Sequence, residues 1–255
     1  MAYTRAAPGR AAQVARRHWP WRESGHGPLP ALLLALTAVT GIVDAVSYLT
    51  LGHVFVANMT GNVVFLGFAL AGAPGVSLAA SLAALAAFFA GALVGGRLGV
   101  RAGADRGRQL VAVTTVGGPL LVLAAIAAAV AGQPVSSGAR YALIVPMALT
   151  MGAQNAMARR LAVPDLTTTV LTLTLTGVAA DSRLAGGGGG HPGRRLLAVS
   201  AMLAGALVGA VLVLHVDIVL PLALAALIVE GVALAAARRS REANADWARP
   251  PASSA

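Results

Sequence analysis

Long apolar runs are the feature that most constrains how this chain can fold. Several of them approach or reach the ~20 residues that an α-helix needs to cross ~30 Å of hydrocarbon. They cover about residues 29–43, 76–94, 110–131, 139–151, 196–216 and 218–237. Only 11% of the 255 residues are charged, whereas soluble domains hold roughly 25%. The chain is therefore predicted to be an all-α, polytopic membrane helix bundle; a β-barrel would show short alternating segments instead.

The positive charge of the chain is distributed as a topology signal. All 19 basic residues are Arg, and they gather at the ends of the apolar runs, as in multi-pass membrane proteins. This distribution argues against a nucleic-acid partner. The absence of cysteine excludes disulfides and thiol chemistry. We expect an Arg-rich cytoplasmic tail at 1–28, a membrane domain at 29–237 and a disordered cytoplasmic tail at 238–255.

Two shorter apolar pieces, 54–71 and 165–180, decide the predicted topology. If both crossed the membrane, the Arg-rich loops at 97–108 and 159–160 would lie outside, against the positive-inside rule. If both enter and return on the same side, 18 of the 19 Arg residues lie on the cytoplasmic side and only Arg140 lies outside. We therefore expect about six transmembrane helices plus two re-entrant or short helices, with both termini in the cytoplasm.

Short sequence matches indicate an internal repeat. T-G-I-V-D-A around Gly41 resembles M-G-A-Q-N-A around Gly152, and A-G-A-L-V-G occurs at 90–95 and again at 204–209. Three spans per repeat is an odd number, so the halves must have opposite orientations, as in many transporters. The predicted repeats are residues 29–131 and 139–237.

Asp44 lies about 14 residues into the first apolar run. A carboxylate at that depth is costly, so we expect it to face the bundle interior. One interpretation is a proton or cation site, or an acceptor for a polar substrate. The other is a structural carboxyl group that is protonated, or hydrogen-bonded to Ser47, Tyr48 or a neighbouring helix. Both stay open at this point.

A second polar cluster, Asn58, Thr60 and Asn62, is typical of the start of a helix. Asn and Thr cap free N–H groups, and a helix N-terminus attracts anions or polar solutes. The alternative is that these groups satisfy only their own backbone. Together with their counterparts in the second half, the candidate substrate-binding residues are Asp44, Tyr48, Asn58, Thr60, Asn62, Gln154, Asn155, Thr168 and Thr172.

No motif for nucleotide, metal or hydrolytic chemistry is present. We therefore expect neither an enzyme nor a cofactor nor a metal site. Glu230, inside the last apolar run, is either paired with Arg238 or Arg239 or a second ionisable site.

Two stretches resemble the signatures of a known family. G-I-V-D-A-V-S-Y-L-T-L-G-H-V-F-V-A-N-M-T-G-N is similar to the first signature of the YoaK family, also called domain of unknown function 1275. G-A-Q-N-A-M-A-R-R-L followed by V-P-D-L-T-T-T-V-L-T resembles the second. The resemblance covers about residues 30–237. It implies a bacterial integral membrane protein and supplies no established substrate or catalytic residue.

The leading functional hypothesis is a small-solute or ion transporter or channel of the bacterial inner membrane, with a polar site near the midplane. The alternative is a non-transporting scaffold or accessory subunit whose polar residues are structural. The expected partners are the lipid bilayer and an unknown small solute or ion, and the pattern also allows a homo-oligomer.

Overall fold

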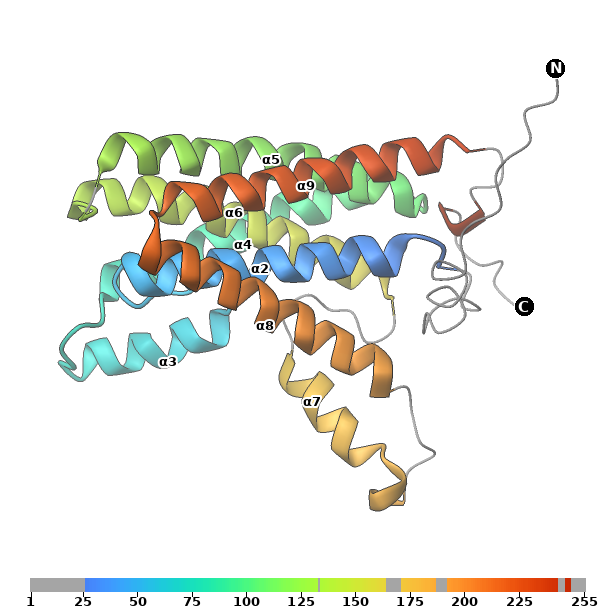
Figure 1. The fold of residues 1–255 in the computed structure, drawn as a ribbon, viewed down its shortest axis with the longest axis horizontal. Coiled ribbons are helices and arrows are strands. Elements are labelled where there is room, and N and C mark those ends of the chain that lie inside the picture. Colours follow the sequence, from blue (N-terminus) through green and yellow to red (C-terminus); the bar gives the residue numbers. More distant parts are fainter. Residues whose placement is uncertain (1–25, 133, 164–170, 187–191, 243–245, 249–255) are drawn as a thin grey trace.

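The computed structural model describes residues 26–132, 134–163, 171–186, 192–242 and 246–248. Within these residues the chain forms eight α-helices and two short 3₁₀ helices and no strand, which confirms the predicted all-α helix bundle (Figure 1). The elements are α2 (Leu29–Thr50), α3 (Met59–Leu70), α4 (Leu78–Arg101), α5 (Arg106–Ala131), α6 (Ser137–Leu161), α7 (Leu171–Ala180), η1 (Arg183–Ala185), α8 (Pro192–His215), α9 (Val219–Ser240) and η2 (Asp246–Ala248).

Six helices are long enough to cross a bilayer. Helices α2, α4, α5, α6, α8 and α9 have 22 to 26 residues each, or at least about 33 Å at ~1.5 Å per residue. Five of them are also sufficiently apolar along their length. The exception is α6, which carries Thr150 and Gln154 in its middle and packs against α4 and α5. Because these helices cover it, α6 tolerates more polar residues than a lipid-facing span.

The two remaining helices are short, as predicted. Helix α3 has 12 residues and α7 has 10, so they reach only about 18 and 15 Å and are too short to cross the hydrocarbon. The chain leaves the end of α2, runs back toward the middle of the molecule, and α3 then returns to the same end (Figure 1). His53 Nδ1 lies 3.0 Å from the carbonyl oxygen of Gly75, so the two ends of this excursion meet.

Glycines allow two pairs of long helices to pack in close contact. A Cβ on Gly91 of α4 would overlap the carbonyl oxygen of Leu149 in α6, and a Cβ on Gly205 of α8 would overlap that of Ala38 in α2. Both glycines belong to the repeated A-G-A-L-V-G segments. Small residues let helix backbones approach closely inside a membrane. The two copies of the hexapeptide therefore make equivalent contacts.

The two ends of the described chain lie together. Gly27 packs against Trp247: a Cβ atom placed on Gly27 would lie 2.6 Å from the Cβ atom of Trp247. The Arg106 guanidinium also forms a hydrogen bond with His26 Nδ1, at 3.0 Å. The side chain of Arg140 lies beside Gly52, just after the C-terminal end of α2, which is the end of the bundle opposite to residues 26 and 248 (Figure 1). Arg140 is thus separated from Arg106, which lies at the end of the bundle where residues 26 and 248 meet; which end faces the cytoplasm stays a prediction.

The C-terminal end differs from the expected tail. Helix α9 continues past residue 238 to Ser240, and Trp247 and Ala248 are buried. Arg239 Nε lies 3.7 Å from Glu242, so the ion pair that Arg239 makes is with Glu242 and not with Glu230. The reason is local: Glu242 follows within one helical turn, whereas Glu230 lies more than two turns earlier.

Candidate functional site

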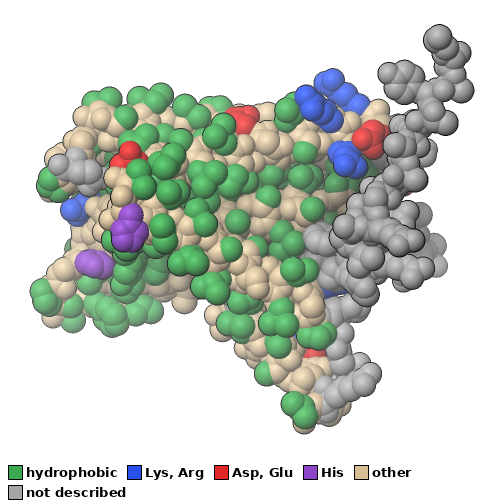
Figure 2. All heavy atoms as spheres, viewed as in Figure 1, with side chains coloured by type: hydrophobic (Ala, Val, Ile, Leu, Met, Phe, Trp, Pro, Cys, Tyr) green, Lys and Arg blue, Asp and Glu red, His purple; other side chains and the backbone are tan. Residues whose placement is uncertain are grey.

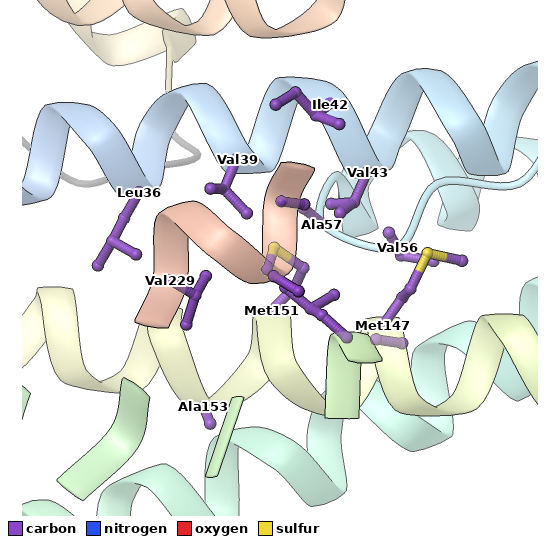
Figure 3. Close-up of a cluster of buried hydrophobic side chains, with 14 of the residues drawn as sticks. Leu36, Val39, Ile42, Val43, Val56, Ala57, Met147, Met151, Ala153 and Val229 are labelled. Carbon is purple, nitrogen blue, oxygen red and sulfur yellow. The ribbon is translucent and has the colours of Figure 1, made fainter. Parts of the chain in front are cut away.

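A non-helical segment of turns and bends, residues 51–58, connects α2 to α3 and enters the core; we call it the extended segment because it continues neither helix. Its side chains Val54, Val56 and Ala57 are buried, and Val56 and Ala57 lie among the core residues of α2, α6 and α9 (Figure 3). A segment without helical hydrogen bonds needs other partners for its backbone N–H groups at this depth. These partners come from two of the predicted site residues.

Asp44 is the first of these partners. Its carboxylate oxygen Oδ1 accepts hydrogen bonds from the backbone N–H of Val56 at 3.0 Å and of Ala57 at 2.8 Å. The side chain is only 6% exposed. Ser47 bonds to the backbone carbonyl of Asp44, not to its carboxylate. The carboxylate therefore anchors the extended segment to α2.

Asn62 is the second partner. Its Oδ1 accepts from the N–H of Phe55 at 2.9 Å, and its Nδ2 donates to the carbonyl oxygen of the same residue at 2.6 Å. One amide side chain thus satisfies both backbone groups of Phe55. Asn62 is completely buried and faces the protein.

Asn58 and Thr60 are placed differently, at the N-terminus of α3. The Asn58 side chain accepts from the N–H of Gly61 at 3.3 Å, which is the predicted cap. Both residues are exposed and line an open cavity of about 500 Å³. Thr172 of α7 lines the same cavity from the second half of the chain. We call this cavity the α3–α7 chamber.

The walls of the α3–α7 chamber are mainly apolar. They include Val64, Phe65 and Phe88. Sequence reasoning missed these residues, because a phenylalanine inside an apolar run has the same local pattern whether it faces lipid or a cavity. The chamber therefore combines a helix N-terminus and threonine hydroxyls with an apolar wall, the composition common in small-molecule sites.

Tyr48 does not line this chamber. Its ring stacks on Phe55 with centroids 5.0 Å apart and meets His53 edge-on at 5.2 Å. Aromatic pairs at such distances stabilise a fold by about 0.5–1.5 kcal/mol. Tyr48 therefore packs the outer part of the extended segment against α2.

The candidates in α6 point in two directions. Gln154 Nε2 donates to the carbonyl oxygen of Leu36 at 3.2 Å and to Thr40 Oγ1 at 3.0 Å, and so joins α6 to α2. Asn155 bonds to its own helix at Met151. It also lines a second cavity of about 510 Å³ with Phe88 and Arg159.

The predicted set is thus divided in the structure. Asp44, Asn62 and Gln154 are occupied by internal hydrogen bonds, Tyr48 packs on aromatic rings, and Thr168 lies outside the described residues. Three candidates line the α3–α7 chamber, namely Asn58, Thr60 and Thr172. Asn155 lines a neighbouring cavity, and Phe88 contributes to the walls of both. Within the described part of the chain, no group of three or more His, Cys, Asp or Glu side chains could hold a metal ion.

Comparison with known proteins agrees with this architecture. The family model described as "Protein of unknown function (DUF1275)" matches residues 32–235. The UPF0700 transmembrane protein YoaK of Bacillus subtilis (strain 168) is 38% identical over 153 residues, which cover 58% of this chain and 64% of that protein. The match thus spans less than two thirds of the relative's length. No solved structure matches the chain significantly.

Proposed function

The chain is a multi-pass membrane protein of the DUF1275 family, and we propose that it moves a small polar solute or ion through the α3–α7 chamber. The observation that carries this proposal is the chamber itself. Residues from the two halves of the sequence, Thr60 and Thr172, line one cavity although 112 positions separate them. Both lie in the first turn of a short helix, Thr60 in α3 and Thr172 in α7.

The packing of the long helices supports the proposal. Helix α4 packs on α6 and α8 packs on α2, and each contact uses a glycine from the repeated hexapeptide. Consecutive long helices run in alternate directions (Figure 1), so α2 and α6 are antiparallel. We infer that residues 29–131 and 139–237 are copies related by a pseudo-two-fold axis in the membrane plane. In transporters built on this plan, broken or re-entrant helices of the two halves meet near the midplane, where the solute binds.

The chemistry of the chamber favours a small polar or anionic solute. The N-terminus of α3 presents partial positive charge, and the hydroxyls of Thr60 and Thr172 can donate or accept hydrogen bonds. No acidic side chain is among the described residues that line the chamber. Asp44 has a supporting role, because it positions the segment that leads into α3.

The first experiment asks whether water fills the chamber. The native chain contains no cysteine, so single Thr60→Cys and Thr172→Cys variants can be treated with a small charged methanethiosulfonate in proteoliposomes. We expect both to react. Leu203→Cys is the matched control: Leu203 is 67% exposed on α8 but faces lipid, where the reagent does not partition.

The second experiment measures transport. Proteoliposomes are challenged with a panel of inorganic anions, alkali cations and small neutral solutes, and flux is followed by light scattering and ion-selective electrodes. We expect Thr60→Val and Thr172→Val to lower the flux of the transported solute about tenfold, which corresponds to one hydrogen bond of ~1.4 kcal/mol. Thr115→Val is the control, since the Thr115 hydroxyl is exposed and bonds to its own helix on α5.

One observation favours a second candidate function, a non-transporting scaffold or accessory subunit. Asp44, Asn62 and Gln154 all make internal hydrogen bonds, as structural residues would. If Thr60→Cys and Thr172→Cys stayed unmodified and no solute in the panel moved, the scaffold would replace the transporter as the better explanation.

A further inference from the structure

Glu230 is a carboxylate on the outer side of the bundle at mid-depth. It lies near the midpoint of α9, and its side chain lies against Gly118, which is near the midpoint of α5. A Cβ at Gly118 would overlap the Glu230 Oε1 atom, so the glycine creates the space that the carboxylate occupies. Ionisable side chains at this depth are rare and costly in membrane proteins, and they usually mark function.

Nothing in the described part of the chain neutralises this carboxylate. No ion pair or hydrogen bond joins Glu230 to another described residue, and Arg239 of the same helix pairs with Glu242 instead. The chain contains no Lys, and the described Arg residues lie near the ends of the long helices. A second copy of the chain, packed at the same depth, would therefore bring no cation to Glu230. A counter-charge for the ionised form of Glu230 would therefore come from another molecule.

The surroundings of Glu230 define what kind of molecule fits. Glu230 lies at one end of a groove between α5 and α9, and its carboxylate is turned toward Gly118. The groove has a volume of about 380 Å³, within the ~300–1,000 Å³ of typical small-molecule sites. The other described side chains that line the groove are apolar, and among them Val122, Ile126 and Leu227 are exposed. Figure 2 shows acidic atoms among hydrophobic side chains along the edge where α5 and α9 run.

We propose that the α5–α9 groove binds a lipophilic monocation, an amine or quaternary ammonium group carried on a hydrocarbon body. The hydrocarbon body buries itself against the apolar walls, and the cation lies beside Glu230. A small hydrated cation would gain nothing from the apolar walls, and a neutral lipid would leave the carboxylate without a partner. The groove shares no residue with the α3–α7 chamber. Cation binding in the groove is therefore independent of the proposed transport through the chamber.

The experiment uses the full-length protein in phosphatidylcholine nanodiscs and measures binding of radiolabelled decyltrimethylammonium, with empty nanodiscs subtracted. We expect saturable binding that Glu230→Gln weakens at least about tenfold, because a charge pair at the depth of the hydrocarbon is lost. Glu230→Asp keeps the charge and should retain part of the affinity. Glu242→Gln, which removes an exposed carboxylate at the end of the bundle, should bind like the native protein.

A carboxylate reagent gives a second readout that does not depend on affinity. Dicyclohexylcarbodiimide is apolar and modifies carboxyl groups that it reaches from the hydrocarbon, so mass spectrometry should find it on Glu230, and decyltrimethylammonium should protect that residue. Equal competition by uncharged decanol, or unchanged binding to Glu230→Gln, would overturn the proposal. So would a change of oligomeric state in Glu230→Gln without any binding of the probe, since the carboxylate would then serve a contact between copies.

Discussion

A buried carboxylate usually suggests chemistry, but Asp44 is explained by the backbone groups that it binds. The extended segment contributes two N–H groups that have no helical partner, and one carboxylate oxygen accepts both. A protein interior that excludes water makes such groups expensive when they are left unpaired. The residue that the sequence marks as the candidate for ion coupling therefore holds the entrance to α3 in place.

Replacement of Asp44 tests this role. Asp44→Ala leaves two buried N–H groups unpaired and should lower the free energy of unfolding by about 2–4 kcal/mol. Asp44→Asn retains an oxygen acceptor and should cost much less. Thermal unfolding in detergent measures the difference. If Asp44→Asn abolished transport while its unfolding temperature stayed native, the carboxylate would have an ionic role beyond anchoring.

The same amide-to-acid change should have opposite effects at two neighbouring positions. Asn62→Asp keeps the acceptor for Phe55 N–H but places an oxygen against the Phe55 carbonyl, so we expect a loss of about 1–3 kcal/mol. Asn58→Asp should be neutral or slightly stabilising, because Asp caps a helix as well as Asn does and its charge favours the N-terminus. Equal unfolding temperatures for the two variants would contradict the hydrogen-bond assignments.

At the scale of helices, contact between backbones organises the bundle. Gly95 on α4 faces α6, and its ideal Cβ position is 2.6 Å from the Cα of Ala153. Gly96, the next residue, faces open space with nothing within 4 Å. Two adjacent glycines thus have different environments, because successive residues of a helix point about 100° apart.

This pair gives a matched prediction. Gly95→Ala should push α4 away from α6 and destabilise the protein by about 1–3 kcal/mol, the usual cost of overpacking. Gly96→Ala meets no neighbour and should stabilise the helix by about 0.5–1 kcal/mol. The unfolding temperatures of the two variants in detergent measure this difference. A Gly95→Ala variant as stable as the native protein would refute the close-packed α4–α6 interface.

At the scale of the whole molecule, the decisive feature is the excursion that ends at Gly75. Because His53 and Gly75 meet, the loop after α3 lies at the same end of the bundle as the loop after α2. A chain in which α3 crossed the membrane would place these loops on opposite sides, and every later helix would be inverted.

Cysteine labelling tests this topology without disturbing native thiols. Single cysteines at Pro74 and Ser136 should react with an impermeant maleimide in intact cells, whereas one at Ala104 should react only after the membrane is permeabilised. All three positions are exposed. A cysteine at Pro74 that behaved like one at Ala104 would show that α3 crosses the membrane.

The sequence predicts well what depends on local pattern. The six long helices follow from apolar run length, the short α3 and α7 from their reduced length, and the Asn58 cap from the residues next to it. A helix cap depends on residues within about one helical turn, and a membrane span depends on the length of one continuous apolar run. Both can therefore be found from the order of residues alone.

Only the tertiary structure decided which polar residues serve the fold and which are available to a solute. Asp44, Asn62 and Asn58 share one stretch of sequence, yet the first two bind the extended segment and the third lines the α3–α7 chamber. Thr172 joins that chamber from the other half of the chain, and Glu230 lies in a groove without a counter-charge among the described residues. The physical reason is that a hydrogen bond or a cavity depends on atoms brought together by folding, and their spacing along the chain does not reveal it.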